Sequence, residues 1–331
     1  MQRRLPPVKS RRNAYASVKA FLMLGYAARR IAGIVPVLLI LITVSFFVVR
    51  LAPGGPFDQA RPLPARIRAE LGQLYGLDQP LPLQYWHYLE GLAHGNLGPS
   101  FKMRDDTVAG LIAQGLPVSL TLGLSALALA LLAGVPFGLW AALGRGGMPD
   151  HALTVFAAVS LALPSFVTGP FLALAFGLWL HWLPVAGWQA GEPRYLILPA
   201  VTLALPVCAS VARLMRGGML DVLESSFVRA ARARGLGRLR VWLCHALRPA
   251  LVPVVSYLGP AVAYLVTGSL VVETVFALPG TGRYLVQGAL DRDYTLVMGM
   301  VLLYGTLTLL SNLAADLIHA WLDPRVRDEH A

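Results

Sequence analysis

Six long apolar segments limit this chain more than any other feature of its sequence. Each is close to the roughly 20 helical residues that cross about 30 Å of hydrocarbon. They span residues 31–51, 117–143, 152–180, 195–214, 254–272 and 295–321. Apolar residues make up 56% of the 331 residues and charged residues only 14%. We therefore predict an all-α polytopic membrane protein with six transmembrane helices, several of them kinked by proline.

The lysine and arginine residues are distributed unevenly between these segments. Of the 28, 19 fall in the segments of one side and 8 in those of the other, with Arg50 at the end of a span. Cytoplasmic segments are the ones enriched in these residues, so we predict that both termini are cytoplasmic. The predicted cytoplasmic segments are a basic tail (1–30), a loop (213–250) and a C-terminal tail (322–331), and the external ones are 52–116 and 273–294. The first span, 31–51, then precedes a five-helix core at 117–321.

The cytoplasmic loop contains a basic amphipathic run, SFVRAARARGLGRLRVWLCHALRPALVP, at 226–253. Arginines alternate with small and apolar residues on both sides of Gly235 and Gly237. This pattern predicts a short helix, a glycine-centred bend and a second helix. We interpret the run as a docking surface for a partner that supplies force. An amphipathic helix lying on anionic lipid is the alternative.

The external segment 52–116 contains one helical apolar face, formed by Leu81, Tyr85, Tyr88, Leu89 and Leu92, before a turn rich in glycine and asparagine. Two interpretations stay open. The segment is a lid that packs on the protein's own outer surface, or it also contacts a protein that delivers the substrate.

The sequence lacks the motifs of common enzyme and metal sites. None of the three lysines follows a glycine, which excludes a phosphate-binding loop, and there is no H-E-x-x-H or G-x-S-x-G motif. The two cysteines, Cys208 and Cys244, are too few for a disulfide framework or a four-cysteine metal site. The net charge of +11 is explained by the positive-inside rule, so nucleic-acid binding is not expected. We predict no catalytic residue, no metal site and no cofactor bound by this chain.

A proton-coupled carrier would be expected to bury a carboxylate near the middle of the membrane. We expect none there, because Glu273 and Asp316 fall near the ends of their apolar segments, where interfacial water solvates them. The candidate pathway residues are small hydroxyls: Ser160, Ser165, Thr168, Thr267 and Ser269. Back-bonding of these hydroxyls within their own helices is the alternative. Since no internal repeat is visible, a pathway would need a second subunit.

Several stretches together resemble the permease subunits of dipeptide and oligopeptide ABC importers, a branch that includes nickel and glutathione uptake systems. They are RRIAGIVPVLLILITVSFFVVRLAPGGP, LGQLYGLDQPLPLQYWHYLEGLAHGNLGPSF, SLALPSFVTG, LPVAGW, FVRAARARGLGRLRVWLCHALRPALVPVV and VVETVFALPGTGRYLVQGALDRDYTLVMG. The resemblance covers nearly the whole chain from Arg30 onward.

Within this resemblance, the basic run is similar to the EAA loop, whose short coupling helix fits a groove on the ATPase subunit. Arg229, Ala230 and Ala231 occupy the E-A-A positions and Gly235 is the loop glycine; Arg229 departs from the glutamate that names the motif. The residues that the resemblance assigns to coupling are Phe227, Arg229, Ala230, Ala231, Arg232, Arg234 and Gly235.

The stretch 273–282 resembles the extracytoplasmic segment of these permeases that faces the solute-binding protein or the gate. Its candidate residues are Glu273, Phe276, Pro279, Gly280 and Gly282. In this interpretation the proline and glycines make a re-entrant turn and Phe276 plugs the path. A simple tight loop is the alternative.

The resemblance implies a subunit that pairs with a second, similar permease in a bacterial inner membrane. It further implies two cytoplasmic ATPase subunits, which bind ATP and magnesium, and an extracytoplasmic binding protein that delivers dipeptides or oligopeptides. This chain itself would perform no covalent chemistry. Glutathione, a nickel chelate or another small solute is the alternative substrate. A stand-alone secondary carrier and a membrane-embedded enzyme are the rival classes.

Overall fold

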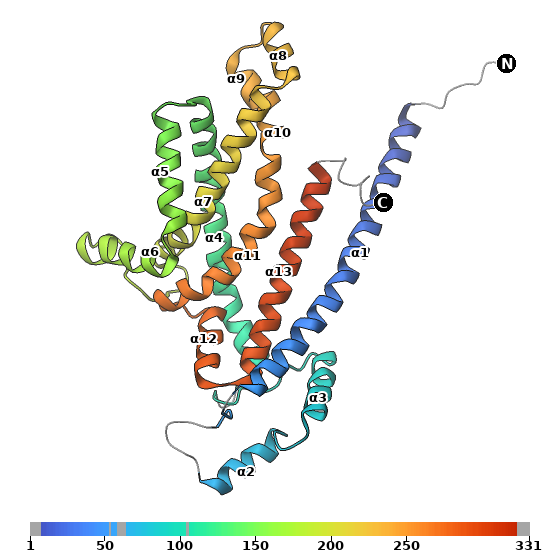
Figure 1. The fold of residues 1–331 in the computed structure, drawn as a ribbon, viewed down its shortest axis with the longest axis vertical. Helices are drawn as coiled ribbons and strands as arrows, with labels where there is room; N and C mark the ends of the chain where they lie inside the picture. The colour runs from blue at the N-terminus through green and yellow to red at the C-terminus, as the bar shows by residue number, and fades with distance from the viewer. Residues whose placement is uncertain (1–7, 53, 58–63, 104–105, 323–331) are drawn as a thin grey trace, which may run out of the picture.

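The computed structural model describes residues 8–52, 54–57, 64–103 and 106–322, and Figure 1 shows their arrangement. Within these residues five helices are long and apolar enough to cross a membrane, and a bent helix pair at 148–179 would make six if it counts as one span. They are α1 (Val8–Leu51), of which residues 30–51 form the apolar part, α4 (Val108–Leu143), α7 (Arg194–Leu223), α11 (Val252–Val275) and α13 (Tyr294–Leu322). The prediction of an all-α polytopic protein is confirmed. Three bounds differ by more than five residues from the sequence prediction: α1 already begins at Val8, within the predicted tail, α4 begins at Val108 instead of Pro117, and α7 ends at Leu223 instead of Leu214.

The third predicted span is not one continuous helix. Residues 152–180 fall in α5 (Met148–Ala162), α6 (Ser165–Leu172) and the π-helical η1 (Ala173–Trp179), and the chain bends by 106° between α5 and the α6–η1 pair. Leu163, at the bend, has an extended backbone (φ −88°, ψ 117°) before Pro164. Proline disfavours the helical conformation in the residue that precedes it, which explains the break. In Figure 1, α6 extends sideways from the lower end of α5.

The centre of the bundle is the contact between α4 and α7. The buried face of α4 repeats small residues at Ala126, Ala130, Gly134 and Gly138. A Cβ added at Gly134 would lie 2.9 Å from the carbonyl oxygen of Cys208, so the two backbones approach each other closely there. Small residues at a helix contact of this kind are typical of packing inside membranes, where dispersion contacts replace the hydrophobic effect between helices.

The external segment folds onto one end of the bundle as α2 (Ala65–Leu74) and α3 (Leu81–Ala93). The predicted apolar face of α3 lies against α1: the hydroxyl oxygens of Tyr85 and Thr43 are 2.7 Å apart, and the rings of Tyr85 and Phe46 are 5.1 Å apart. Tyr88 lies in the same contact, and burial raises the pKa of its hydroxyl to about 12. The part of the lid interpretation that concerns packing on the protein's own surface agrees with these contacts.

The basic loop lies at the opposite end of the bundle from α2 and α3 (Figure 1). It consists of α8 (Ser226–Ala233), α9 (Arg238–Arg240), the π-helical η2 (Val241–Ala246) and α10 (Leu247–Ala250). One further helix, α12 (Thr281–Asp291), connects the end of α11 to the start of α13. The relative placement of the two loops agrees with the predicted topology, and the sidedness itself stays a prediction.

Candidate functional site

The basic loop has the helix, bend and second helix that its sequence predicts. The hydroxyl of Ser225 donates to the carbonyl oxygen of Val222 at 2.6 Å where α7 ends, and α8 begins at the next residue. After α8, the backbone N–H of Gly235 donates to the carbonyl oxygen of Arg232 at 2.9 Å, and Gly235 itself has φ +79°. This left-handed conformation is accessible to glycine without steric cost, which explains the residue type at the bend.

One face of α8 packs on the protein and the other is free of it. Val228 is fully buried and Ala231 nearly so, in the same cluster as Met219 of α7 and Val241 of η2. The other predicted coupling residues are exposed: Phe227, Arg229, Ala230, Arg232, Arg234 and Gly235. Ala231 therefore holds α8 on its own subunit, while the remaining six residues are exposed and stay a predicted surface for a partner. We call these six residues the exposed coupling surface.

Two exposed apolar residues near this surface were missed by the sequence analysis. Leu239 is 65% exposed, and Leu243, four positions later in the chain, is 50% exposed. Their pattern in the sequence does not distinguish an exposed pair from a buried one, because alternation of leucine and arginine is equally typical of a helix that packs on its own subunit.

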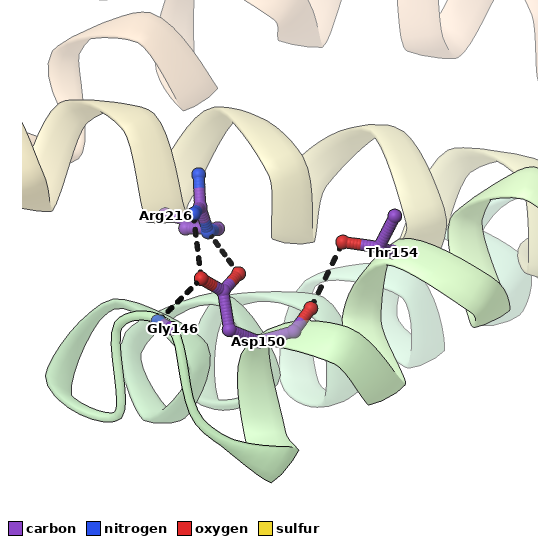
Figure 2. A network of polar contacts seen from close by, with 4 residues as sticks. All are labelled: Gly146, Asp150, Thr154 and Arg216. Carbon is purple, nitrogen blue, oxygen red and sulfur yellow. Dashed lines mark hydrogen bonds and ion pairs between the residues drawn. The ribbon is translucent and has the colours of Figure 1, made fainter.

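An ion pair joins α5 to α7 near the same end of the bundle (Figure 2). Arg216 donates from Nε to Oδ1 of Asp150 at 2.5 Å and from Nη2 to Oδ2 at 2.8 Å. The backbone N–H of Gly146 donates to the same carboxylate at 2.9 Å. Asp150 is buried and lies in the first turn of α5, where its negative charge interacts favourably with the helix dipole. Sequence analysis missed both residues.

The corner between α11 and α12 contains a buried carboxylate, Glu273, which is 0% exposed. Its Oε2 accepts a hydrogen bond from the backbone N–H of Gly282 at 2.8 Å. A Cβ at Gly280 would collide with this carboxylate and would lie 2.7 Å from Oγ of Ser119, so only glycine fits that position. The expectation that interfacial water solvates Glu273 is wrong.

Two other helices supply neighbours of this corner. Ser119 of α4 and Tyr304 of α13 both bond Thr281, the first residue of α12, at 2.9 Å and 3.1 Å. Glu273 itself lies two residues before the end of α11, and α12 encloses it there. The expectation that no carboxylate lies near the middle of the membrane stays a prediction.

The hydroxyls of Ser119, Thr281 and Tyr304 border a cavity of about 60 Å³, together with Ser269 and a mainly apolar wall. Of the five predicted pathway residues, only Ser269 lines this cavity. Sequence analysis missed Ser119, Thr281 and Tyr304, because their contacts join segments far apart in the chain.

The other four predicted pathway hydroxyls lie elsewhere, and two of them bond their own helices. Thr168 donates to the carbonyl oxygen of Pro164 at 3.3 Å, and Thr267, which is exposed, donates to that of Ala263 at 3.0 Å. Ser269 donates to the carbonyl oxygen of Val266 at 2.8 Å. Back-bonding, the alternative considered for these residues, thus describes three of the five. Ser160 is buried in α5 and Ser165 is half-buried at the start of α6.

Phe276 connects the corner to the bent helix α6. Its side chain is 1% exposed, and a Cβ added at Gly169 of α6 would lie 3.3 Å from its ring. Its carbonyl oxygen accepts a hydrogen bond from the backbone N–H of Gly187 at 2.8 Å. Pro279, which follows, is half-buried. The five candidate gate residues therefore lie together at the corner between α11 and α12, with Phe276 packed against α6.

Among the residues that the structure describes, no group of three or more histidine, cysteine, aspartate or glutamate side chains is placed to hold a metal ion. Asp316, near the other end of α13, forms an ion pair with Arg30 of α1 at 2.9 Å, and both side chains are partly exposed.

Comparison with known proteins gives full-length matches. The chain is 47% identical over 92% of its length to the oligopeptide transport system permease protein OppB of Haemophilus influenzae, all of which is covered. It is 35% identical to the dipeptide transport system permease protein DppB of Bacillus subtilis, over 92% of this chain and 98% of that one. It is 37% identical to the glutathione transport system permease protein GsiC of Pectobacterium atrosepticum, over 92% of this chain and 99% of that one.

The fold is similar to that of a chain of the MetNI methionine ABC transporter, solved in inward facing conformations, with a TM-score of 0.53 and 18% identity over 64% of this chain and 96% of that one. Two family models match successive parts of the sequence. The N-terminal model of the binding-protein-dependent transport system membrane component covers residues 23–123, and the model of the inner membrane component itself covers residues 134–328. The chain belongs to the family of binding-protein-dependent transport system inner membrane components.

Proposed function

We propose that this chain forms, with a second permease, the membrane path of an ATP-driven importer of dipeptides or oligopeptides. The observation that carries the proposal is the 47% identity over the whole length of an oligopeptide permease. The match extends through the external segment and the basic loop, so it is not confined to the apolar spans, which many membrane proteins share.

The exposed coupling surface supports the second part of the proposal, that two ATPase subunits drive this permease. A short helix with one buried and one exposed face is fixed to α7 by Val228 and Ala231 and presents arginines and Phe227 outward. Such a helix transmits a rigid-body displacement of a partner into the helix that carries it. ATP and magnesium bind in the ATPase subunits, and the basic loop and both termini are cytoplasmic. The present chain contributes no group to hydrolysis.

An extracytoplasmic binding protein delivers the peptide to the opposite end, where α2, α3 and α12 lie. The corner formed by Glu273, Phe276, Pro279, Gly280 and Gly282 is the gate on that side. Thr168, Ser160, Ser165, Thr267 and Ser269 remain candidates for the walls of the path, and Ser269 is the one next to a cavity.

Reconstitution of the complete complex in vesicles tests the proposal. With ATP enclosed and peptide-loaded binding protein added, we expect peptide to accumulate, and we expect uptake to stop on ATP depletion but to survive proton and sodium uncouplers. Uptake by this chain alone that is driven by a proton gradient would show a secondary carrier instead, for which the buried Glu273 would be the first residue to test.

Glutathione is the second candidate substrate, and the 37% identity to a glutathione permease favours it over other small solutes. Mass spectrometry of the ligand that copurifies with the binding protein separates the two candidates. A bound peptide of ordinary α-linkages supports the peptide importer, and bound glutathione supports the alternative.

A further inference from the structure

The ion pair between Asp150 and Arg216 is partly protected from solvent and is held in a defined geometry. The side chain of Asp150 is 10% exposed and that of Arg216 is 32% exposed. The guanidinium meets both carboxylate oxygens, and the backbone N–H of Gly146 adds a third bond (Figure 2). Bidentate pairs of this kind fix orientation as well as distance.

Arg216 lies on the part of α7 that leads directly into the basic loop. Its helix continues for two turns to Leu223, and α8 begins at Ser226. Val228 of α8 packs in the same cluster as Met219 of α7. Because only two residues separate the two helices, we expect a displacement of α8 to displace the end of α7 as well.

Asp150 lies at the start of a helix that leads to the bend in the middle of the bundle. From α5 the chain passes Pro164 into α6, where Gly169 contacts the ring of Phe276. The ion pair thus connects α7 to α5. The chain continues from α7 into the exposed coupling surface, and from α5 into α6, which packs against the candidate gate.

The apolar contacts between these helices hold them together. Leu153 of α5 packs with Ala141 of α4 and Ala212 of α7 in a small cluster, and the partly buried rings of Phe137 and Phe156 pack against it. Apolar contacts of this kind favour association, whereas an oriented polar pair specifies the register of the two helices.

We propose that Asp150 and Arg216 are positioning residues that make α5 and the end of α7 move as one body during transport. This inference rests on the proposed function, since it assigns a role in passing movement from the coupling surface to the bend at Pro164. A second ion pair offers a matched control: Arg145 and Glu224 join the same two regions at 2.8 Å, but both side chains are more than 60% exposed. An exposed pair contributes little, because solvent and salt screen it.

The test uses the complete complex, reconstituted in vesicles with its second permease, ATPase subunits and peptide-loaded binding protein. Peptide uptake and ATP hydrolysis are measured in the same vesicles for Asp150→Asn, Arg216→Gln, the double variant and the control Arg145→Gln. We expect the peptide taken up per ATP hydrolysed to fall about tenfold in each single variant, within the usual range of coupling between sites. The control should resemble the unaltered complex.

The double variant shows whether the two residues act through each other. It leaves no unpaired buried charge, so it assembles even if a single variant does not. We expect its loss of uptake per ATP to be no larger than that of the worse single variant, because both changes remove the same interaction. Losses that simply add, or unchanged uptake per ATP in all three assembled variants, would overturn the proposal.

A distance measurement makes the test independent of the substrate. Spin labels on cysteines at Met148 of α5 and Asp221 of α7, both exposed, are introduced with Cys244→Ser to remove the exposed native thiol. With the pair intact, we expect the same label distance in the ATP-free and ATP-bound complex, and a nucleotide-dependent distance in the double variant. A distance that changes equally in both would reject the single-body inference.

Absence of peptide uptake by the unaltered complex would instead reject the proposed substrate. The label distance would still decide the role of the ion pair.

Discussion

The carboxylate of Glu273, at the end of α11, accepts a hydrogen bond from the backbone N–H of Gly282 in the first turn of α12, at 2.8 Å. Gly282 is one of the residues whose N–H has no acceptor inside its own helix, so the carboxylate serves the start of α12 as a cap supplied from another helix. The absence of a Cβ at Gly280 and Gly282 allows this approach, since a side chain at either would strike the carboxylate. The corner therefore depends on a buried acid and two glycines together.

Replacing Glu273 by alanine should weaken the corner more than replacing it by glutamine. Alanine removes the acceptor of the Gly282 N–H, at a cost of about 1–3 kcal/mol for a buried group left without a partner. Glutamine retains a carbonyl oxygen of similar size at the same place. We expect Glu273→Ala to lower the thermal stability of the purified complex and its peptide uptake, and Glu273→Gln to retain most of both. If glutamine is as damaging as alanine, the negative charge and not the hydrogen bond is what the site requires.

Asp293 attaches the external segment to the start of α13. It is fully buried, and its Oδ2 accepts from the hydroxyl of Ser100 at 2.5 Å and from the backbone N–H of Phe101 at 2.9 Å. Its Oδ1 accepts from the backbone N–H of Leu296 at 3.1 Å, which caps α13. We predict that Asp293→Ala costs about 2–3 kcal/mol, because it removes a helix cap and orphans several donors.

Limited proteolysis of the external segment measures this effect directly. Asp293→Ala should be cleaved between α3 and α4 faster than the unaltered protein. Ser100→Ala is the graded control, since it removes one donor and leaves the acid and the cap in place, and it should show a smaller increase. Equal cleavage of all three proteins would mean that Asp293 does not hold the segment.

The parts of the fold that the sequence predicted are those that depend on local pattern. Apolar length alone located the span helices, and the glycine between two basic runs located the bend at Gly235, because a left-handed turn needs that residue wherever it occurs. The break at Pro164 was misread as a kink. A proline inside a span is compatible with both outcomes, and packing of α6 against Phe276 and α7 decides between them.

The parts that failed depend on contacts between distant segments. Glu273 follows an apolar run, so hydropathy places it at a membrane surface, and only the return of α12 encloses it. Asp150 and Arg216 are 66 positions apart, and neither has a local signal that names its partner. A single sequence therefore identifies the helices and the bend of the basic loop but not the polar contacts that fix the helices relative to one another.

Cysteine labelling tests the predicted sidedness. The excess of arginine and lysine in the basic loop predicts that Gly237 is cytoplasmic and that His94, at the end of α3, is external. On a Cys244→Ser background, an impermeant thiol reagent added to sealed cells should modify cysteine at position 94 and leave cysteine at position 237 unmodified. Permeabilised cells provide the control, in which both react. The opposite labelling pattern would reverse the topology.

The bend of the basic loop offers a test of the coupling surface in which one substitution controls for the other. Gly235 and Gly237 are both exposed, and a Cβ at either would meet no atom within 4 Å, but only Gly235 has a positive φ, at +79°. Alanine at Gly235 should cost about 1–2 kcal/mol of backbone strain, and alanine at Gly237, where φ is −60°, should cost almost nothing.

We expect Gly235→Ala, and more strongly Gly235→Val, to reduce ATPase binding and peptide uptake in the assembled complex, since strain at the bend shifts α8 relative to α9. Copurification of the ATPase subunits with this chain measures the binding. If Gly237→Ala impairs binding as much as Gly235→Ala does, the conformation of the bend is not what the ATPase subunit recognises.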